Sequence, residues 1–511
     1  MDTKQLRDLL KTFIQENKFF ILIFLIGLFL RVYKLSSFFQ FSHEQDLQAW
    51  IVKDILVDHH PRLIGQETSI TGFFIGPLYY YMLIPFFFLF NMDPRASIIP
   101  ITFISLATIV SVYYIYTKLF GKKVGEIGSF IYAISPAIVF LDRWAVPTQP
   151  TLLWSIWFYY CLIQFARGNF KPIPILIVLI GLIWHIHVAF VPLLLLVPIA
   201  LFLGKRGIVI GLKNINRKSL ILSLIIFLVL LIPFVAFEFR HNFQQVKGFL
   251  GVNDFSLGQA KELREGYYKV EVITEYINRV VWSPLFNQVN PKNPTLVKIP
   301  IMLFVFLGLV YFLSYKKLIP KNETVLLYLW FVIVFLGQMI SKRIISDYYF
   351  NNLITLSLMV FSLVFYQVYL SKSGKRLILI IGIAFLLLGI SKVVFKDTSI
   401  QEFANRKDVV EFIVEDMKKN GYQCSGINFI GDISVRYGYR YLTLWKGVNQ
   451  ITPGDSVPVY SIVQPFSISE SEVVFISGNI GVILPQDPQT PDQSICYDPE
   501  RQLLPLNGFV N

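Results

Sequence analysis

Residues 19–30 read FFILIFLIGLFL, a run that holds no charged side chain. A membrane-crossing helix needs roughly 20 mainly apolar residues, and comparable runs recur along the chain as far as Ile390. The segment before the first run is basic, with Lys4, Arg7, Lys11 and Lys18, and no small-residue cleavage pattern follows. The run is therefore predicted to be an uncleaved first transmembrane helix.

The composition supports a membrane protein over the whole length. Of 511 residues, 54% are hydrophobic and only 15% are charged, a balance that excludes a water-soluble globular protein of this size. The net charge of +13 could suit nucleic acid, but in a membrane protein the placement of the positive charges matters more than their sum. We expect membrane lipids as partners and no nucleic acid.

The basic residues cluster in short loops, and such loops stay in the cytoplasm. The clusters lie around Lys118–Lys123, Arg167–Lys171, Lys205–Lys218, Lys316–Lys321 and Lys372–Arg376. Placing all five inside predicts about eleven transmembrane helices, near 19–35, 97–117, 124–141, 150–166, 172–187, 188–203, 218–238, 298–315, 323–340, 348–370 and 376–394. The fold class is then an all-α polytopic protein of the cell (plasma) membrane, with a cytoplasmic N-terminus and an external tail.

One apolar run does not fit this alternation. Phe73–Phe90 reads FFIGPLYYYMLIPFFFLF, and a crossing there would move every later basic cluster outside. Pro77 and Pro85 also remove backbone donors from a helix. We interpret the run as an interfacial helix at the outer leaflet, with an ordinary span as the alternative. Residues 36–95 and 239–298 are then external loops of a transmembrane domain at 1–395.

The two segments 172–187 and 188–203 are each short for a membrane crossing, since about 16 residues make roughly 24 Å of helix. The turn between them contains His185 and His187 and should lie below the outer membrane surface. Ionisable groups at that depth usually face a cavity or a pathway. A pair of interfacial histidines is the alternative.

The tail, 396–511, is predicted to be a small α/β domain outside the cytoplasm. A helical pattern near Phe403–Lys418 precedes strand-like runs at Gly426–Ile430, Val457–Val463 and Glu472–Ile476. Cys424 and Cys496 both fall in this domain and could pair there. The sequence contains no metal-spaced Cys/His set, no Walker loop and no Gly-rich nucleotide motif, so we predict no metal site and no ATP-driven transport.

The first external loop carries the candidate chemistry. Ser42 and Gln45 form a capping-box pattern, and the helix that follows presents Leu47, Ile51 and Ile55 on one stripe that we expect to lie in lipid. Glu44 would then be fixed at the helix start, just above the membrane, where it could deprotonate a hydroxyl group. Its alternative role is to complement the helix dipole. Asp46 is the second candidate for the catalytic carboxylate.

The order of these features resembles the GT-C superfamily of membrane glycosyltransferases, in particular the protein O-mannosyltransferase and aminoarabinose transferase branch of families 39 and 83. The features that carry the resemblance, over about Phe19–Arg240, are the first span, Glu44 with the helix to Leu56, Gly76-Pro77-Leu78-Tyr79-Tyr80, Arg95, and Pro136 through Arg143-Trp144-Ala145.

The resemblance implies transfer of a sugar, with inversion, from a polyprenyl-phosphate donor to the hydroxyl of a glycan, lipid or protein acceptor on the outer face of the membrane. Register through Lys53-Asp54-Ile55-Leu56 puts the family's catalytic aspartate at Glu44, which is a departure of one methylene. The family's second acidic position is not evident around Thr148-Gln149-Pro150, and Asp142 comes several residues early. A divalent metal is therefore not supported, and no cofactor is predicted.

The departing lipid phosphate would need fixed positive or hydrogen-bonding groups, and arginine suits bidentate phosphate contact. Each arginine could instead be an interfacial anchor. The substrate-binding and phosphate-binding candidates are Arg95, Arg143, His187, Arg240, His241, Arg343 and Tyr348.

Two other functions compete with this prediction. An O-antigen ligase or polymerase also joins lipid-linked sugars, and Arg240 with His241 in a late external loop could serve it. A lipid-linked sugar transporter or flippase would need polar residues spread through the spans, whereas the charges here mostly lie in loops and at span ends.

Overall fold

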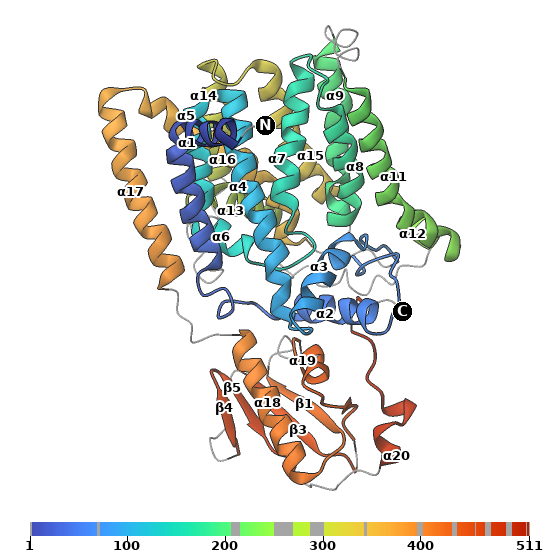
Figure 1. Ribbon diagram of the computed structural model, residues 1–511. Helices are drawn as coiled ribbons and strands as arrows, with labels where there is room; N and C mark the ends of the chain where they lie inside the picture. The colour runs from blue at the N-terminus through green and yellow to red at the C-terminus, as the bar shows by residue number, and fades with distance from the viewer. Residues whose placement is uncertain are drawn as a thin grey trace.

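The computed structural model contains a bundle of apolar helices with a small sheet domain at one end (Figure 1). It describes residues 3–68, 72–205, 215–249, 269–286, 301–341, 345–395, 402–431, 437–454, 456–464, 472–486, 493–506 and 508–509.

Helices occupy most of each predicted transmembrane segment. They are α1 (Thr3–Val32), α4 (Ile98–Phe120), α5 (Lys122–Ile134), α6 (Pro136–Asp142), α7 (Thr151–Ala166), α8 (Ile173–Ile186), η2 (Val188–Leu195), α9 (Leu196–Leu203), α11 (Arg217–Arg240), α14 (Ile301–Tyr315), α15 (Lys321–Ile340), η5 (Asp347–Leu353), α16 (Ile354–Tyr369) and α17 (Lys372–Val394). The prediction of an all-α polytopic membrane protein is confirmed.

Within the described ranges, five helical stretches are long and apolar enough to cross a membrane, or six if the bent pair α5–α6 is one span. That pair bends by 68°, because Pro136 begins α6 without a backbone donor. Helices α7, α8 and α14 are apolar but shorter, and so is the joined η2–α9 segment. The eleven predicted spans are thus helical, although several are too short to span a membrane by length alone.

Two further helices lie at the end of the bundle that faces the sheet domain (Figure 1): α2 (His43–Leu56) and α3 (Leu78–Leu89). Helix α3 corresponds to the ambiguous run Phe73–Phe90. Its 12 residues make about 18 Å of helix, well short of a hydrocarbon core of about 30 Å. This length fits the interfacial interpretation.

In the described part of the tail, the sheet has five strands in the order β2-β1-β3-β5-β4. Strand β1 pairs in parallel with β2 and β3, whereas β5 pairs antiparallel with β3 and β4. The elements are α18 (Glu402–Asn420), β1 (Ser425–Gly431), α19 (Arg440–Trp445), β2 (Gln450–Ile451), β3 (Val459–Gln464), β4 (Phe475–Ser477), β5 (Ile480–Ile483), α20 (Gln493–Cys496) and η7 (Pro499–Arg501). The α/β character is as predicted, and Cys424 and Cys496 form a disulfide.

The sheet domain and the first loop share one apolar core. Leu47 and Ile51 of α2 belong to the same buried cluster as Val409 of α18 and Tyr460 of β3. The expectation that the apolar stripe of α2 lies in lipid is therefore wrong. The stripe packs against protein because the sheet domain covers α2.

Candidate functional site

Helix α2 begins at a capping box, as its sequence predicts. The N–H of Ser42 donates to Oε1 of Gln45 at 3.0 Å, and Nε2 of Gln45 donates to the carbonyl of Ala145 at 3.0 Å. These contacts fix the start of the helix against the loop between α6 and α7. Glu44, in the first turn, is partly buried and its Oε2 accepts a hydrogen bond of 2.9 Å from Nε2 of Gln66.

Glu44 lines a polar cavity of about 330 Å³ at the junction of the bundle with the sheet domain. The lining consists of His43, Glu44, Leu47, Gln66, Glu67, Thr68, Ile75, Trp144, Val146, Pro147, Thr148, Ile186, His187, Tyr348 and Gly508. Among the described residues, this lining includes two carboxylates and two histidines but no lysine or arginine. We call it the polar cavity.

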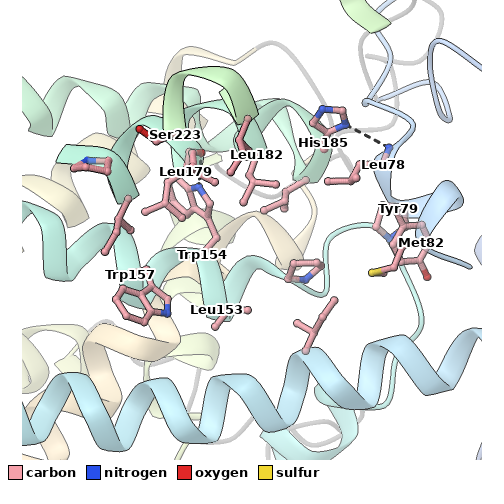
Figure 2. Close-up of a pocket in the computed structure, with 18 of the residues that line it drawn as sticks. Leu78, Tyr79, Met82, Leu153, Trp154, Trp157, Leu179, Leu182, His185 and Ser223 are labelled. Carbon is pink, nitrogen blue, oxygen red and sulfur yellow. Dashed lines mark hydrogen bonds between the residues drawn. The ribbon is translucent and has the colours of Figure 1, made fainter. Parts of the chain in front are cut away.

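An apolar groove of about 570 Å³ adjoins the polar cavity. Figure 2 shows its lining, which α3, α4, α7, α8 and α11 supply. Trp154 lies beside Leu179, and its Nε1 donates to the Leu179 carbonyl at 2.9 Å. At one end of the groove the N–H of Leu78 donates to Nδ1 of His185 at 3.4 Å. Pro147 and Ile186 line both the groove and the polar cavity, so the two spaces meet at these residues.

The predicted residues His187 and Tyr348 lie together at this cavity with Glu44. The ring centroids of His187 and Tyr348 are 5.5 Å apart. His187 follows Ile186, which lines both the polar cavity and the groove. The N–H of Ala189 donates to Nδ1 of His187 at 3.1 Å, which leaves Nε2 as the ring nitrogen that can carry a proton. Three of the predicted site residues thus meet in one place.

Asp46 does not join them. It is buried, and its carboxylate accepts hydrogen bonds from the N–H groups of Gly438, Arg440 and Tyr441 at 3.2, 3.3 and 2.7 Å. Burial raises the pKa of Asp46 to about 6, against the opposing effect of these donors and of His43. Asp46 caps the start of α19, so its contacts are structural and the catalytic candidacy of Asp46 loses its support.

The predicted arginines lie outside the lining that the described residues form. Arg95 pairs with Asp93 at 2.5 Å. Arg143 is buried and donates to the carbonyls of Leu30 and Tyr33; its Nε and Nη1 have no hydrogen-bond partner in the described part of the chain. The sequence pattern does not show that Arg95 pairs with Asp93 or that Arg143 contacts Leu30 and Tyr33.

The late-loop candidates also lie elsewhere. Arg240 ends α11 with an exposed side chain, and Nδ1 of His241 lies 3.0 Å from the carbonyl oxygen of Phe237, in the preceding turn. Arg343 and its neighbour Lys342 fall outside the described residues, so Arg343 stays a prediction from the sequence.

Sequence reasoning missed several residues of the polar cavity. His43 precedes Glu44 directly, and its Nδ1 is buried without a hydrogen bond to any described residue; its position beside Glu44 could have indicated it. Gln66 and Glu67 follow α2 in the same loop and carry polar side chains, which was a weak signal. Nothing in the sequence points to Gly508.

One group of acidic and histidine residues has metal-like spacing in the described chain: Asp54, Asp58 and His60. Two of its members are already paired, because Arg62 contacts Asp54 at 2.6 Å and Lys53 contacts Asp58 at 2.7 Å. The group is better described as an ion-pair network at the end of α2.

This chain is similar to solved structures, whereas comparison with family models and curated proteins found no match. The structure of ArnT from Cupriavidus metallidurans bound to undecaprenyl phosphate aligns with a TM-score of 0.56 at 12% identity, covering 93% of this chain and 100% of that one. The chain has the GT-C fold. The apo structure of the same ArnT aligns with a TM-score of 0.54, also at 12% identity, covering 92% of this chain and 98% of that one.

The GT-C fold confirms the architecture that the order of motifs in the first half of the chain predicted. The polar cavity lies at the end of the helical bundle that faces the sheet domain.

Proposed function

We propose that this protein is an inverting glycosyltransferase that moves a sugar from a polyprenyl-phosphate donor to an acceptor hydroxyl on the outer face of the cell membrane. The observation that carries the proposal is the junction of an apolar groove with a polar cavity that contains Glu44. A polyprenyl-phosphate sugar has the matching division, an apolar chain joined through phosphate to a polar sugar. The groove suits the chain and the cavity suits the sugar.

The similar structure of ArnT was obtained with undecaprenyl phosphate bound. This supports a lipid of that class as the donor carrier here. The sugar and the acceptor are left open, with a glycan, a lipid or a protein as acceptor classes.

In the proposed reaction Glu44 is the general base. Its carboxylate takes the proton of the acceptor hydroxyl as that oxygen bonds to the anomeric carbon of the sugar. The bond between the anomeric carbon and the phosphate oxygen breaks, and the electron pair leaves with the lipid phosphate. Attack from the face opposite the phosphate inverts the anomeric configuration. The hydrogen bond from Gln66 orients the Glu44 carboxylate.

The leaving phosphate gains negative charge at the junction with the groove. His187 follows Ile186 at that junction and its ring is near that of Tyr348; both side chains can donate hydrogen bonds to phosphate oxygens. Arg343 precedes Tyr348 by five positions in the sequence and is proposed as the charged partner on sequence grounds. Arg95, Arg143 and Arg240 are less suited because their side chains lie away from the cavity lining.

We propose that residues 1–395 form the transferase domain. In the proposed orientation the N-terminus is cytoplasmic and residues 396–511 lie outside the cytoplasm. An O-antigen ligase or polymerase that uses Arg240 and His241 has less support, since neither residue lies with Glu44. For a transporter or flippase, no residue of the polar cavity provides a comparable argument.

The direct test uses purified protein with a panel of undecaprenyl-phosphate sugars and measures the release of undecaprenyl phosphate. Turnover with at least one donor supports the proposal. Binding of undecaprenyl phosphate without turnover of any donor would favour the transporter alternative.

A further inference from the structure

A short segment of the sheet domain returns to the polar cavity. In Figure 1 the chain after α20 runs back from the sheet towards α2. Gly508 lines the cavity with Glu44, although 464 positions separate them in the sequence (508 − 44). We name the described residues 502–506 and 508–509 the strap.

The strap is held at its start by the sheet domain. Gln502 forms an antiparallel bridge with Ile451 of β2. The guanidinium of Arg440 donates to the carbonyls of Leu503 and Leu504 and also lies over the ring of Trp50 in α2 at 5.1 Å. The strap is therefore tied both to its own domain and to the helix that carries Glu44.

The strap is held at its other end by the first loop. The N–H of Glu67 donates to the carbonyl of Gly508 at 3.2 Å. The guanidinium of Arg62 lies 4.2 Å from the ring centroid of Phe509, which makes a cation–π contact. These contacts keep Gly508 against the cavity.

Gly508 allows a close approach that other residues would not. Its φ is +84°, and a Cβ at this position would lie 3.3 Å from Cδ2 of Leu47. Leu47 itself lines the polar cavity. A side chain at position 508 would thus be strained and would crowd the wall of the cavity beside Leu47.

This wall belongs to the side from which an acceptor would enter. Gly508, Leu47 and Glu67 line the polar cavity, whereas the residues that the groove shares with it are Pro147 and Ile186. On the proposed function, the donor chain occupies the groove. The first loop and the strap supply lining on the part of the cavity that the groove does not share.

We infer that the strap is the acceptor-side wall of the site and that Gly508 sets the size of acceptor that can reach Glu44. The inference rests on the proposed function, because only a transfer reaction has an acceptor. The wall itself is testable without any transfer reaction.

The test measures access to the cavity with a cysteine at Thr148, which lines it. The chain has three cysteines; Cys424 and Cys496 are paired and Cys161 is buried, so the background reaction is low. In detergent-purified Thr148→Cys protein, the labelling rate is compared for N-ethylmaleimide and for a large sulfonated fluorophore maleimide.

Gly508→Leu should slow the large reagent about tenfold and N-ethylmaleimide less than twofold. The matched control is Gly447→Leu, because Gly447 has φ +83° and no atom within 4 Å of its Cβ position; it carries the same backbone strain away from the cavity. Phe509→Ala should loosen the strap and speed the large reagent several-fold. Undecaprenyl phosphate binding, followed by the change in total tryptophan fluorescence, to which Trp154 and Trp157 of the groove contribute, should change less than twofold.

Equal rates for the large reagent in all variants would overturn the inference. A parallel change in both reagents and in lipid binding would also overturn it, because the strap would then affect the whole site and not the acceptor side alone. If the access results hold but no undecaprenyl-phosphate sugar turns over in the wild type, the proposed function fails and the strap remains a cavity wall.

Discussion

Oδ1 of Asp46 accepts a hydrogen bond of 2.7 Å from the backbone N–H of Tyr441, 395 positions later in the chain. Asp46 lies two residues after Glu44 on α2, so the sheet domain is attached directly beside the proposed base. The position of Glu44 therefore depends on the sheet domain as well as on the capping box.

Asp46→Asn should reduce stability more than it reduces chemistry. The asparagine amide nitrogen cannot accept the N–H groups that now point at the carboxylate, and loss of buried hydrogen bonds of this kind costs about 1–3 kcal/mol. We expect a lower melting temperature and a smaller loss of transfer than for Glu44→Gln. Thermal unfolding and transfer assays on the same preparations would check this. A drop in transfer equal to that of Glu44→Gln at unchanged stability would return Asp46 to the chemistry.

The pH dependence of stability should report the same residue. The pKa of Asp46 in the folded protein, about 6, lies above the ordinary value of 3.8. The folded state then holds an extra proton between these values, and the contribution of Asp46 to stability falls as the pH rises from about 4 to about 6. Asp46→Asn has no proton to lose and should flatten that part of the profile. Melting temperatures from pH 4 to pH 7 that vary identically in the two proteins would contradict this.

The apolar groove can be tested with two leucines of α11. Leu222 lines the groove, whereas Leu224 does not belong to its lining; their exposed fractions are 58% and 44%. Leu222→Asn places a polar group against the lipid chain and should weaken undecaprenyl phosphate binding roughly three- to tenfold. Leu224→Asn is the matched control and should bind as the wild type does. Equal weakening by both would mean that the chain does not lie in the groove.

The orientation makes a prediction for labelling in intact cells. Asn91 and Ser456 are exposed, and the carbonyl of Asn91 accepts a hydrogen bond from Trp445 of the sheet domain. Asn91→Cys and Ser456→Cys should therefore both react with an impermeant maleimide from outside, and Lys317→Cys should not. A cytoplasmic Asn91 with an external Ser456 would be incompatible with the hydrogen bond between Asn91 and Trp445 of the sheet domain.

The fold was predictable from the sequence where the signal is local. Long apolar runs mark the helices, and the capping box at Ser42 and Gln45 marks the start of α2. The same pattern gave a wrong prediction at Leu47 and Ile51, because an apolar stripe packs equally well against lipid or against a domain far away in the sequence, such as the one that contains Val409.

The site was predictable only in part, for the same reason. Glu44, His187 and Tyr348 meet in the cavity, but proximity to a membrane surface was a poor guide to the arginines. Arg95 and Arg143 are engaged by Asp93 and by backbone carbonyls that no sequence pattern identifies. Gly508 reaches the cavity through tertiary contacts alone.

The measurement that tests the central claim most directly is turnover by Glu44→Gln with an undecaprenyl-phosphate sugar. Glutamine keeps the shape of the side chain, and its carbonyl can still accept from Gln66, but it cannot take a proton. The protein should fold and bind undecaprenyl phosphate as the wild type does, since the loss of the dipole contact costs only about 0.3–1 kcal/mol. Release of undecaprenyl phosphate should fall about 10²- to 10⁴-fold. Near-normal turnover by Glu44→Gln would contradict the account and remove Glu44 from the mechanism.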